Sequence, residues 1–381
     1  MKRPVLRTKL CDMLGIEYPI ISAGMGPSMI GEPNGAPVEL VVAVSEAGGL
    51  GVLGGAGFNL DELRNAIREI RSKTKKPFGV DLLLPKNIMS VDMGTEPVPL
   101  HTFIEKLPKP YLDWLAKVKK ELGLPEIELM VQTDTTVMRP REAVQVCIEE
   151  NVPLFCAGLG NPGFMVKDAH AIGMKVLGIA GNTKNAKQMA SSGLDLIVAQ
   201  GHEAGGHTGR IGTMALLPQV LDAVSPIPVL AAGGIADGRG FAAALAMGCA
   251  GVWVGTRFLA TNEGGAMNIC KQRIIESTDE DTRVSKLYTG KTSRASLTKF
   301  HELWDSSGLE SFPFPVQVLF ASELLGSLVK ANKTEYIGGF AGQISGLIKE
   351  IKPARQVVEE MVAEAVDILT TKLPSSVIVK K

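Results

Sequence analysis

The sequence predicts an α/β fold in which eight strands and the helices between them close into one (β/α)8 TIM barrel. Short apolar segments that end in small residues recur along the first two thirds of the chain, and segments with helical periodicity separate them. From the fourth apolar segment onward, most starts are about 20 to 22 residues apart, which leaves room for a strand, two tight loops and a helix. An open doubly wound sheet can use the same units, but eight strands without a second Rossmann half favour a closed barrel.

The predicted strands are mostly apolar throughout rather than alternating, which is typical of parallel strands that are covered on both faces. Helices are expected between them wherever apolar residues recur with the helical period. The strands are expected at residues 19–23, 50–53, 78–84, 153–157, 175–180, 195–200, 228–232 and 251–255, and the clearest helices at 60–71, 161–172, 183–192, 214–224 and 238–247.

Two parts of the chain do not follow this repeat, so the barrel is assigned to residues 1–84 and 141–260. Residues 85–140 contain a proline-rich stretch and an amphipathic segment at 111–122. A connection this long in a compact domain usually serves a function, and we expect a lid. Residues 261–381 are expected to form a mostly helical extension that packs over the barrel mouth.

The charge balance favours a small-molecule partner. Lysine plus arginine equals aspartate plus glutamate at 40 each, so the chain offers no basic surface for nucleic acid or an anionic membrane. The five cysteines are never spaced as Cys-x-x-Cys, so neither a disulfide framework nor a metal site is indicated. Without a secretory signal or a run of about 18 apolar residues, we expect a cytoplasmic protein, either a monomer or a homodimer.

Glycine-rich loops follow the last three predicted strands. The richest, Q-G-H-E-A-G-G-H-T-G at residues 200–209, lets the backbone approach a flat ligand closely and leaves amide N–H groups free as donors. The seventh strand ends at Gly233 and Gly234, and the eighth at Gly255 followed by Thr256. Because glycines at these places in a barrel usually hold a phosphate group, we predict a phosphate pocket there.

His207 is the predicted catalytic residue, because glycines precede it and Thr-Gly follows it at the barrel mouth. An imidazole with an ordinary pKa of about 6.5 can transfer a proton, or donate a hydrogen bond to a developing anion, at neutral pH. His202 and Glu203 in the same loop either take a direct part or only orient the loop. The other three histidines are interpreted as surface or packing residues.

The segment G-H-E-A-G-G-H-T-G at residues 201–209 resembles the signature loop of the nitronate monooxygenase family, formerly called 2-nitropropane dioxygenases. The same superfamily includes the flavin-dependent enoyl-acyl carrier protein reductases. The similarity runs in order through residues 8–275 and continues more weakly at 341–343. Further segments that carry it lie at residues 19–25, 47–51, 78–81, 232–235 and 254–257.

This resemblance implies one noncovalently bound FMN per chain. Residues at matching positions are expected to contact the cofactor in four places: the flavin ring, its polar edge, the ribityl chain and the phosphate. They are Ala23, Gly24 and Met25 for the ring; Asp81 for its polar edge; Gln200, Gly205 and Gly206 for the ribityl chain and the phosphate; and Gly234, Gly255 and Thr256 for the phosphate. Gly233, and Gln343 of the tail, are also assigned to the cofactor site.

Four features depart from the family pattern. Gly24 replaces a proline that many relatives carry, and Asp81 stands where relatives often have asparagine. A carboxylate beside the flavin would disfavour the anionic reduced flavin unless it were protonated or paired. Ile179 occupies a position where some monooxygenases carry lysine, and the insertion at residues 85–140 exceeds what compact members need. The choice of substrate is therefore open.

Three functions follow from these observations. The first is a nitronate monooxygenase, which oxidises alkyl nitronates with dioxygen to a carbonyl compound and nitrite. The second is an NAD(P)H-dependent FMN reductase of an enoyl thioester or a quinone. Residues 158–163 and 208–218 resemble the corresponding segments of the reductase branch. The third is a barrel that binds a phosphorylated ligand without redox chemistry. Flavin absorption separates the third from the others, and anaerobic bleaching by a nitronate or by NAD(P)H separates the first two.

Overall fold

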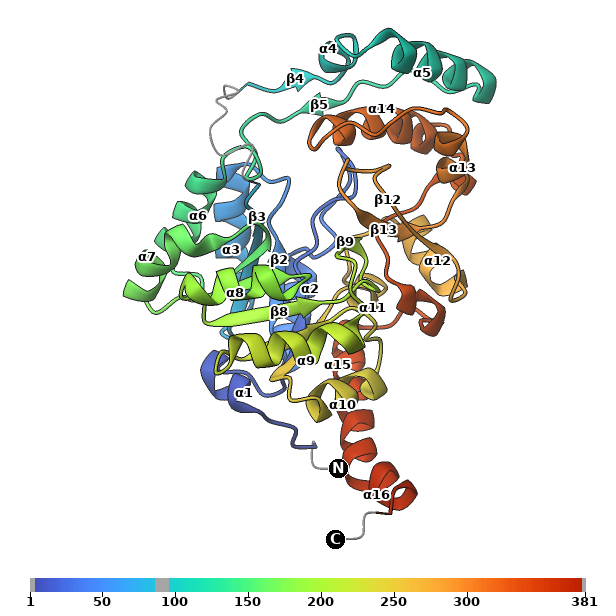
Figure 1. The fold of residues 1–381 in the computed structure, drawn as a ribbon. Helices are drawn as coiled ribbons and strands as arrows, with labels where there is room; N and C mark the ends of the chain where they lie inside the picture. Colours follow the sequence, from blue (N-terminus) through green and yellow to red (C-terminus); the bar gives the residue numbers. More distant parts are fainter. Residues whose placement is uncertain (1–3, 86–95, 379–381) are drawn as a thin grey trace.

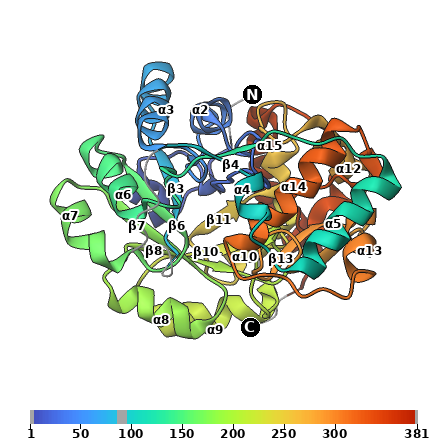
Figure 2. The ribbon, with the colours of Figure 1, turned by 90° about the horizontal axis from the view of Figure 1, so that it is seen from above.

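The computed structural model describes residues 4–85 and 96–378, in which eight parallel strands form a closed barrel (Figures 1 and 2). The sheet runs in the order β1-β11-β10-β8-β7-β6-β3-β2, and a parallel bridge between Ile21 and Leu50 closes it. The predicted barrel is thus confirmed, and each predicted strand is present. The strands are β1 (Ile20–Ser22), β2 (Gly51–Gly54), β3 (Phe78–Leu83), β6 (Leu154–Leu159), β7 (Lys175–Ala180), β8 (Leu196–Gln200), β10 (Val229–Ala232) and β11 (Gly251–Val254).

The strands are buried on both faces because successive side chains point to opposite sides of the sheet. In β1, Ile20 packs against the surrounding helices, whereas Ile21 belongs to the cluster that fills the barrel interior. The helix α1 (Lys9–Leu14) closes the amino end of the barrel, where Leu10 and Leu14 join that interior cluster. Burial on both sides is the reason that the strands consist of continuous apolar runs.

A ring of helices covers the outside of the barrel (Figure 2). Its eighth place is taken by a helix from the far end of the chain, α15 (Ala354–Asp367), which packs against both α10 and α2. Only the short α11 (Thr256–Leu259) follows β11 directly. The other ring helices are α2 (Val38–Glu46), α3 (Leu60–Lys73), α6 (Pro140–Glu149), α7 (Val166–Ala171), α8 (Thr183–Ser191), α9 (Thr213–Val224) and α10 (Gly238–Ala246).

The C-terminal part contains more than helices. A strand pair, β12 (Thr282–Ser285) and β13 (Ser293–Ser296), forms a small antiparallel sheet with β9 (Gly206–His207), which belongs to the loop after β8. These strands read T-R-V-S and S-R-A-S, so no apolar pattern marked them, and their pairing with a distant segment decided their structure. The helices of this part are α12 (Asn268–Glu276), α13 (Lys299–Asp305), α14 (Val316–Lys330) and, beyond α15, α16 (Leu373–Ser376).

The described part of the insertion lies above α14 in Figure 1 and is packed against it. It contains α4 (His101–Ile104), α5 (Lys109–Leu122) and the short pair β4 (Val98–Pro99) and β5 (Met130–Val131). In the contact between α5 and the C-terminal helices, the rings of Trp114 and Trp304 meet edge to face with centroids 5.5 Å apart. Lys119 Nζ lies 2.6 Å from Glu323 Oε1. Insertion and C-terminal part therefore share a second hydrophobic core above the barrel.

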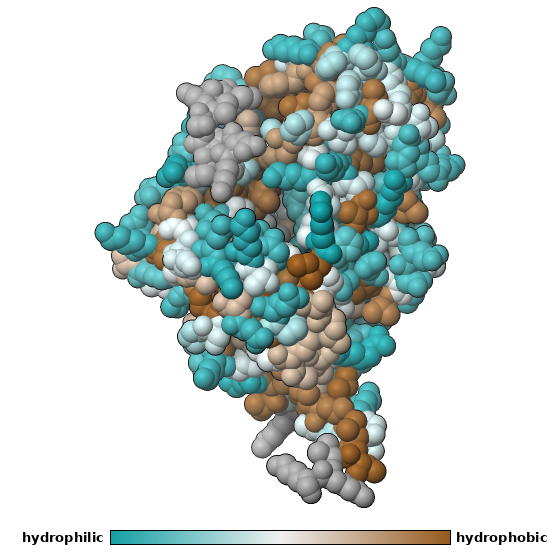
Figure 3. Space-filling model, in the orientation of Figure 1, coloured by the Kyte–Doolittle hydropathy of each residue, from teal (hydrophilic) through white to brown (hydrophobic). Residues whose placement is uncertain are grey.

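The five cysteines are buried and free. Burial raises the pKa of Cys249 to about 11 and that of Cys270 to about 12, so these thiols stay protonated at neutral pH. Within residues 4–85 and 96–378, no cluster of His, Cys, Asp and Glu could hold a metal ion, and no helix is long and apolar enough to cross a membrane. Apolar surface gathers at the lower end of the molecule in Figure 3, where Leu373 and Val377 are exposed.

The close packing of α15 against α10 predicts that a side chain at Gly238 would destabilise the fold. A Cβ at Gly238, the first residue of α10, would lie 2.5 Å from both the backbone nitrogen of Ala365 and the Cβ of Glu364. We expect Gly238→Ala to lower the free energy of unfolding by about 1–3 kcal/mol through overpacking, measured by chemical denaturation. Gly212→Ala is the control, because only a Glu203 oxygen at 3.7 Å lies near its Cβ. Equal stability of the two variants would contradict this account of α15.

Candidate active site

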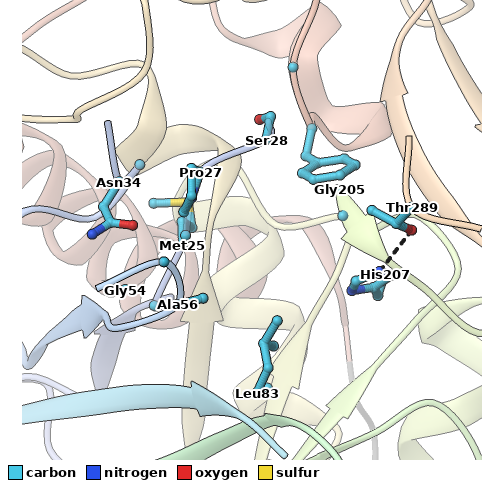
Figure 4. A pocket seen from close by; sticks show the side chains of 18 of the residues that line it. Met25, Pro27, Ser28, Asn34, Gly54, Ala56, Leu83, Gly205, His207 and Thr289 are labelled. Atoms are coloured by element: carbon cyan, nitrogen blue, oxygen red, sulfur yellow. Dashed lines mark hydrogen bonds between the residues drawn. The ribbon is translucent and has the colours of Figure 1, made fainter. Parts of the chain in front are cut away.

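A cavity of about 1180 Å³ lies at the carboxyl ends of the strands, between the barrel and the layer made by the insertion and the C-terminal part (Figure 4). The structure does not bring Gln343 into it: the Gln343 side chain is exposed, and its backbone N–H donates to Glu203 O at 2.9 Å. All other residues that we assigned to the site line this cavity: Ala23, Gly24, Met25, Asp81, Gln200, Gly205, Gly206, His207, Gly233, Gly234, Gly255 and Thr256.

Polar side chains within the loop after β8 hold that loop in shape. Both carboxylate oxygens of Glu203 accept hydrogen bonds from the backbone N–H of Thr213, at 3.0 and 2.9 Å. The imidazole Nδ1 of His202 lies 2.7 Å from the carbonyl oxygen of Gly209, and the Gln200 amide donates to the carbonyl oxygen of His207 at 2.7 Å. The sequence left open whether His202 and Glu203 take a direct part or only orient the loop. These contacts to the loop's backbone favour the orienting role.

A buried cation from the C-terminal part completes the loop. Arg294 on β13 pairs in register with Gly206, and its guanidinium donates to the carbonyl oxygen of His202 at 3.1 Å and to Thr282 Oγ1 at 3.1 Å. Only 4% of Arg294 is exposed, and burial lowers its pKa. A buried guanidinium is tolerated when its N–H groups find acceptors, as they do here. Arg294 therefore fixes the backbone that carries His207.

His207 is held by a second residue from the same part of the chain. Its Nε2 lies 3.0 Å from Thr289 Oγ1 (Figure 4). Burial, followed by the positive charge of Lys291, lowers the pKa of His207 to about 4. At neutral pH the imidazole is therefore uncharged, and it does not titrate near the ordinary histidine pKa as the sequence suggested. The Thr289 hydroxyl can donate or accept, so it accommodates either neutral tautomer.

The predicted phosphate pocket contains unused backbone donors. Among the described residues, none accepts a hydrogen bond from the backbone N–H of Gly234 or Gly255. Gly206 has φ +70°, and a Cβ placed on it would meet nothing within 4 Å, so this position faces open space. Thr256 Oγ1 accepts from the N–H of Gly342 at 2.9 Å, which ties the pocket to the C-terminal part. Unpaired N–H groups beside open space are suited to an anion such as a phosphate.

Asp81 is a buried carboxyl group in the cavity wall, only 7% exposed. The backbone N–H of Gly158 donates to its Oδ1 at 2.7 Å, and among the described residues no charged side chain contributes to its pKa shift. Burial raises the pKa of Asp81 well above the ordinary aspartate value. Burial thus favours the protonated form of this carboxyl group, which can donate a hydrogen bond as an asparagine amide does.

Gly24 and Asp81 fit together. A Cβ at Gly24 would lie 2.2 Å from the Cβ of Asp81, so no larger residue can stand at position 24 without displacing Asp81. In this backbone conformation, glycine at position 24 leaves the space that the Asp81 side chain occupies.

A second cavity of about 430 Å³ adjoins the first, and Gln200 and His207 line both. It is more polar, and Lys291 and Asn182 are among its lining residues. Sequence reasoning missed Lys291, Thr289 and Arg294 altogether. They lie far along the chain from the β8 loop, and the short polar segments around them carry no periodic signal that could have placed them there.

Fold and site together define an enzyme of the TIM-barrel class, whose candidate active site lies at the carboxyl ends of the strands. The sequence matches the nitronate monooxygenase family over residues 7–364, and the chain belongs to this family. It is 31% identical to a Staphylococcus haemolyticus protein described as a probable nitronate monooxygenase, covering 95% of this chain and 98% of that one.

Two solved structures are similar over nearly their whole length. FabK from Thermotoga maritima is 33% identical with a TM-score of 0.74, over 98% of this chain and all of that chain. Nitroalkane oxidase from Streptomyces ansochromogenes is 28% identical with a TM-score of 0.78, over 95% of this chain and 99% of the other. The relatives thus include both a probable nitronate monooxygenase and a FabK protein.

The contact between Thr289 and His207 predicts a positioning role. Thr289→Val keeps the side-chain volume but removes the hydroxyl, so the imidazole loses its partner. We expect turnover to fall on the order of 10- to 100-fold, because a small misplacement of a catalytic group is costly. Thr289→Ser, which keeps the hydroxyl, should retain most activity. Equal turnover of the valine and serine variants would show that the hydrogen bond does not position His207.

Proposed function

We propose that this protein is an FMN-dependent nitronate monooxygenase, which oxidises alkyl nitronates with dioxygen to a carbonyl compound and nitrite. The observation that carries the proposal is one shared cavity, in which unpaired N–H groups at Gly234 and Gly255 lie at the strand ends near the uncharged His207. Membership of the nitronate monooxygenase family supports it.

The residues present fit FMN. Gly205, Gly234, Gly255 and Thr256 would hold the phosphate through backbone N–H groups. The segment 23–25 would lie along the flavin ring. A protonated Asp81 would donate a hydrogen bond to the ring's polar edge, which removes the objection to a carboxylate at that position. Bound FMN would supply the two-electron chemistry, taking electrons from the substrate and passing them to dioxygen.

His207 would act on the nitro group. A nitronate is already an anion, so no strong base is needed, and an imidazole with a pKa of about 4 is a weak one. The useful tautomer carries the proton on Nδ1 and accepts a hydrogen bond from Thr289 at Nε2. The Nδ1–H can then donate to a nitro oxygen as electron density leaves the substrate. The low pKa thus favours nitronates over neutral nitroalkanes, which must first lose a C–H proton.

A second candidate function is an NAD(P)H-dependent FMN reductase of an enoyl thioester or quinone, which the similarity to FabK from Thermotoga maritima favours. A barrel without redox chemistry is the third. Purified protein should show flavin absorption under the first two functions. Under anaerobic conditions the flavin should bleach on addition of a nitronate and not with NADH or NADPH. Bleaching by the nicotinamide alone would favour the reductase instead.

The phosphate pocket can be tested by charge. Gly255→Asp places a carboxylate where the FMN phosphate would lie, and Gly255→Asn adds a side chain of the same size without the charge. In the protein itself a Cβ here meets only Ala23 Cβ at 3.6 Å and Met25 Sδ at 3.7 Å. We expect the aspartate variant to be purified with at least about tenfold less flavin than the asparagine variant. Matching flavin content would place the phosphate elsewhere.

The role of His207 can be tested by rate and by pH. We expect His207→Ala to lower the rate of flavin reduction by a nitronate at least about 100-fold, with unchanged FMN content. In the parent enzyme the rate should show no change that depends on His207 as pH falls from 8 to about 5, because the imidazole is protonated only below its lowered pKa. A change of rate near pH 6.5 that disappears in His207→Ala would contradict the lowered pKa.

A further inference from the structure

The wall of the cavity that faces the barrel mouth is apolar and comes from three separate parts of the chain. We call this wall the roof. It combines the loop after β1, the insertion, and the C-terminal part on either side of α14 (Figure 1). Six apolar or aromatic side chains of the roof line the cavity: Ile30, Phe103, Val131, Phe314, Leu319 and Phe340.

The roof is firmly supported but not covered. Ile30, Val131, Leu319 and Phe340 pack against the second hydrophobic core, and the backbone N–H of Ile30 donates to Ser322 Oγ on α14 at 3.1 Å. None of the six roof side chains is fully buried, so each keeps apolar surface accessible from the cavity. Apolar surface that faces water is favourably covered by an apolar ligand.

The side chains that line the cavity offer no cation to pair with an anionic substrate chain. In the described part of the molecule, no lysine or arginine lines this cavity, and Lys291 lines the smaller one instead. The carboxylates that line it are already engaged by backbone N–H groups. Glu32 accepts from Ser28 at 2.9 Å, Glu62 from Asn59 at 2.8 Å and Glu203 from Thr213 at 2.9 Å.

The size and the continuity of the cavity leave room for a chain. Its volume of about 1180 Å³ exceeds the roughly 300–1,000 Å³ of a site for one drug-sized ligand. FMN would occupy the glycine-lined floor at the strand ends. The roof begins beside the catalytic residue, because the rings of Phe340 and His207 lie with centroids 6.3 Å apart.

We propose that the substrate carries an uncharged apolar chain, which extends from the reacting carbon beside His207 into the roof. The inference rests on the proposed function, since it takes that carbon to be oxidised at bound FMN. It adds the chemical class of the substrate: long-chain alkyl nitronates rather than short or carboxylated ones.

A chain-length series tests the proposal in the holoenzyme. With nitronates of nitroethane through 1-nitrooctane, kcat/KM should rise about three- to fourfold for each added methylene until the roof is filled. The nitronate of 6-nitrohexanoate should react more slowly than that of 1-nitrohexane, because its carboxylate meets no cation in the roof. A flat series, or a preference for the carboxylate, would overturn the proposal.

Variants of the roof should change the slope of this series. Leu319→Asn puts a polar group of similar size in the roof, and the gain in kcat/KM per methylene should fall below about twofold. Leu347→Asn is the matched control, because Leu347 is 55% exposed and does not line the cavity. Val131→Thr replaces one methyl group of the roof by a hydroxyl, and it is the alternative test variant if Leu319→Asn does not fold. An unchanged slope in a folded roof variant would count against the roof.

A binding measurement separates this proposal from the proposed function. Isothermal titration calorimetry with straight-chain primary amides needs no oxidation, and affinity should rise with chain length while the heat-capacity change becomes more negative. If the amides show this trend but nitronates are not oxidised, the proposed function fails and the roof stands. If nitronates are oxidised and neither series depends on chain length, the roof fails and the function stands.

Discussion

The antiparallel pairing of β9 with β13 is the contact on which the candidate site depends. The β8 loop is rich in glycine and has little shape of its own, because glycine imposes no preferred backbone conformation. Hydrogen bonds from Gln200, His202 and Glu203 shape part of it, and the pairing with β13 fixes the Gly206 to His207 segment. Arg294 binds the loop's carbonyl group at His202, and hydrogen bonds from a buried charged group are among the stronger ones in proteins. The barrel supplies the place for the site, and the C-terminal part supplies its geometry.

Burial disfavours charged side chains in the cavity, and this limits the chemistry that the cavity can support. Burial lowers the pKa of His207 to about 4 and raises that of Asp81 well above the ordinary aspartate value, because burial disfavours the ionised form of each. Among the described residues, the backbone N–H groups of Gly234 and Gly255 have no acceptor and would meet an anion in the proposed function. These groups carry partial charge that needs no counter-ion and does not titrate. Such a site suits a reaction in which an anionic substrate gives up electrons and the cofactor's phosphate must be held without lysine.

Through the proposed roof, the layer above the barrel would link substrate choice to stability. The insertion and α14 share one hydrophobic core, so the side chains that face the cavity are held by the same packing that holds the layer together. Described residues of the insertion pair with the C-terminal part through Lys119 and Glu323, and through Trp114 and Trp304. Motion of this layer as a lid would have to move the insertion together with α14 or break those contacts.

The barrel, and most of the residues that line its cavity among those expected for the site, could be predicted from the sequence because they depend on local and repeated signals. Parallel strands buried on both faces are continuous apolar runs, and glycines at strand ends mark close backbone approach. The Gly206 to His207 segment was recognised in this way. The partners of that segment could not be, since Thr289 and Arg294 lie in short polar strands and turns whose structure is set only by pairing with a distant loop. The same holds for α15, which occupies the eighth place in the helical ring although a long segment separates it from β11. The acidity of His207 and Asp81 was likewise decided by tertiary structure, because a pKa depends on the burial and charges that the folded chain assembles around a group, and these are not local properties of the sequence.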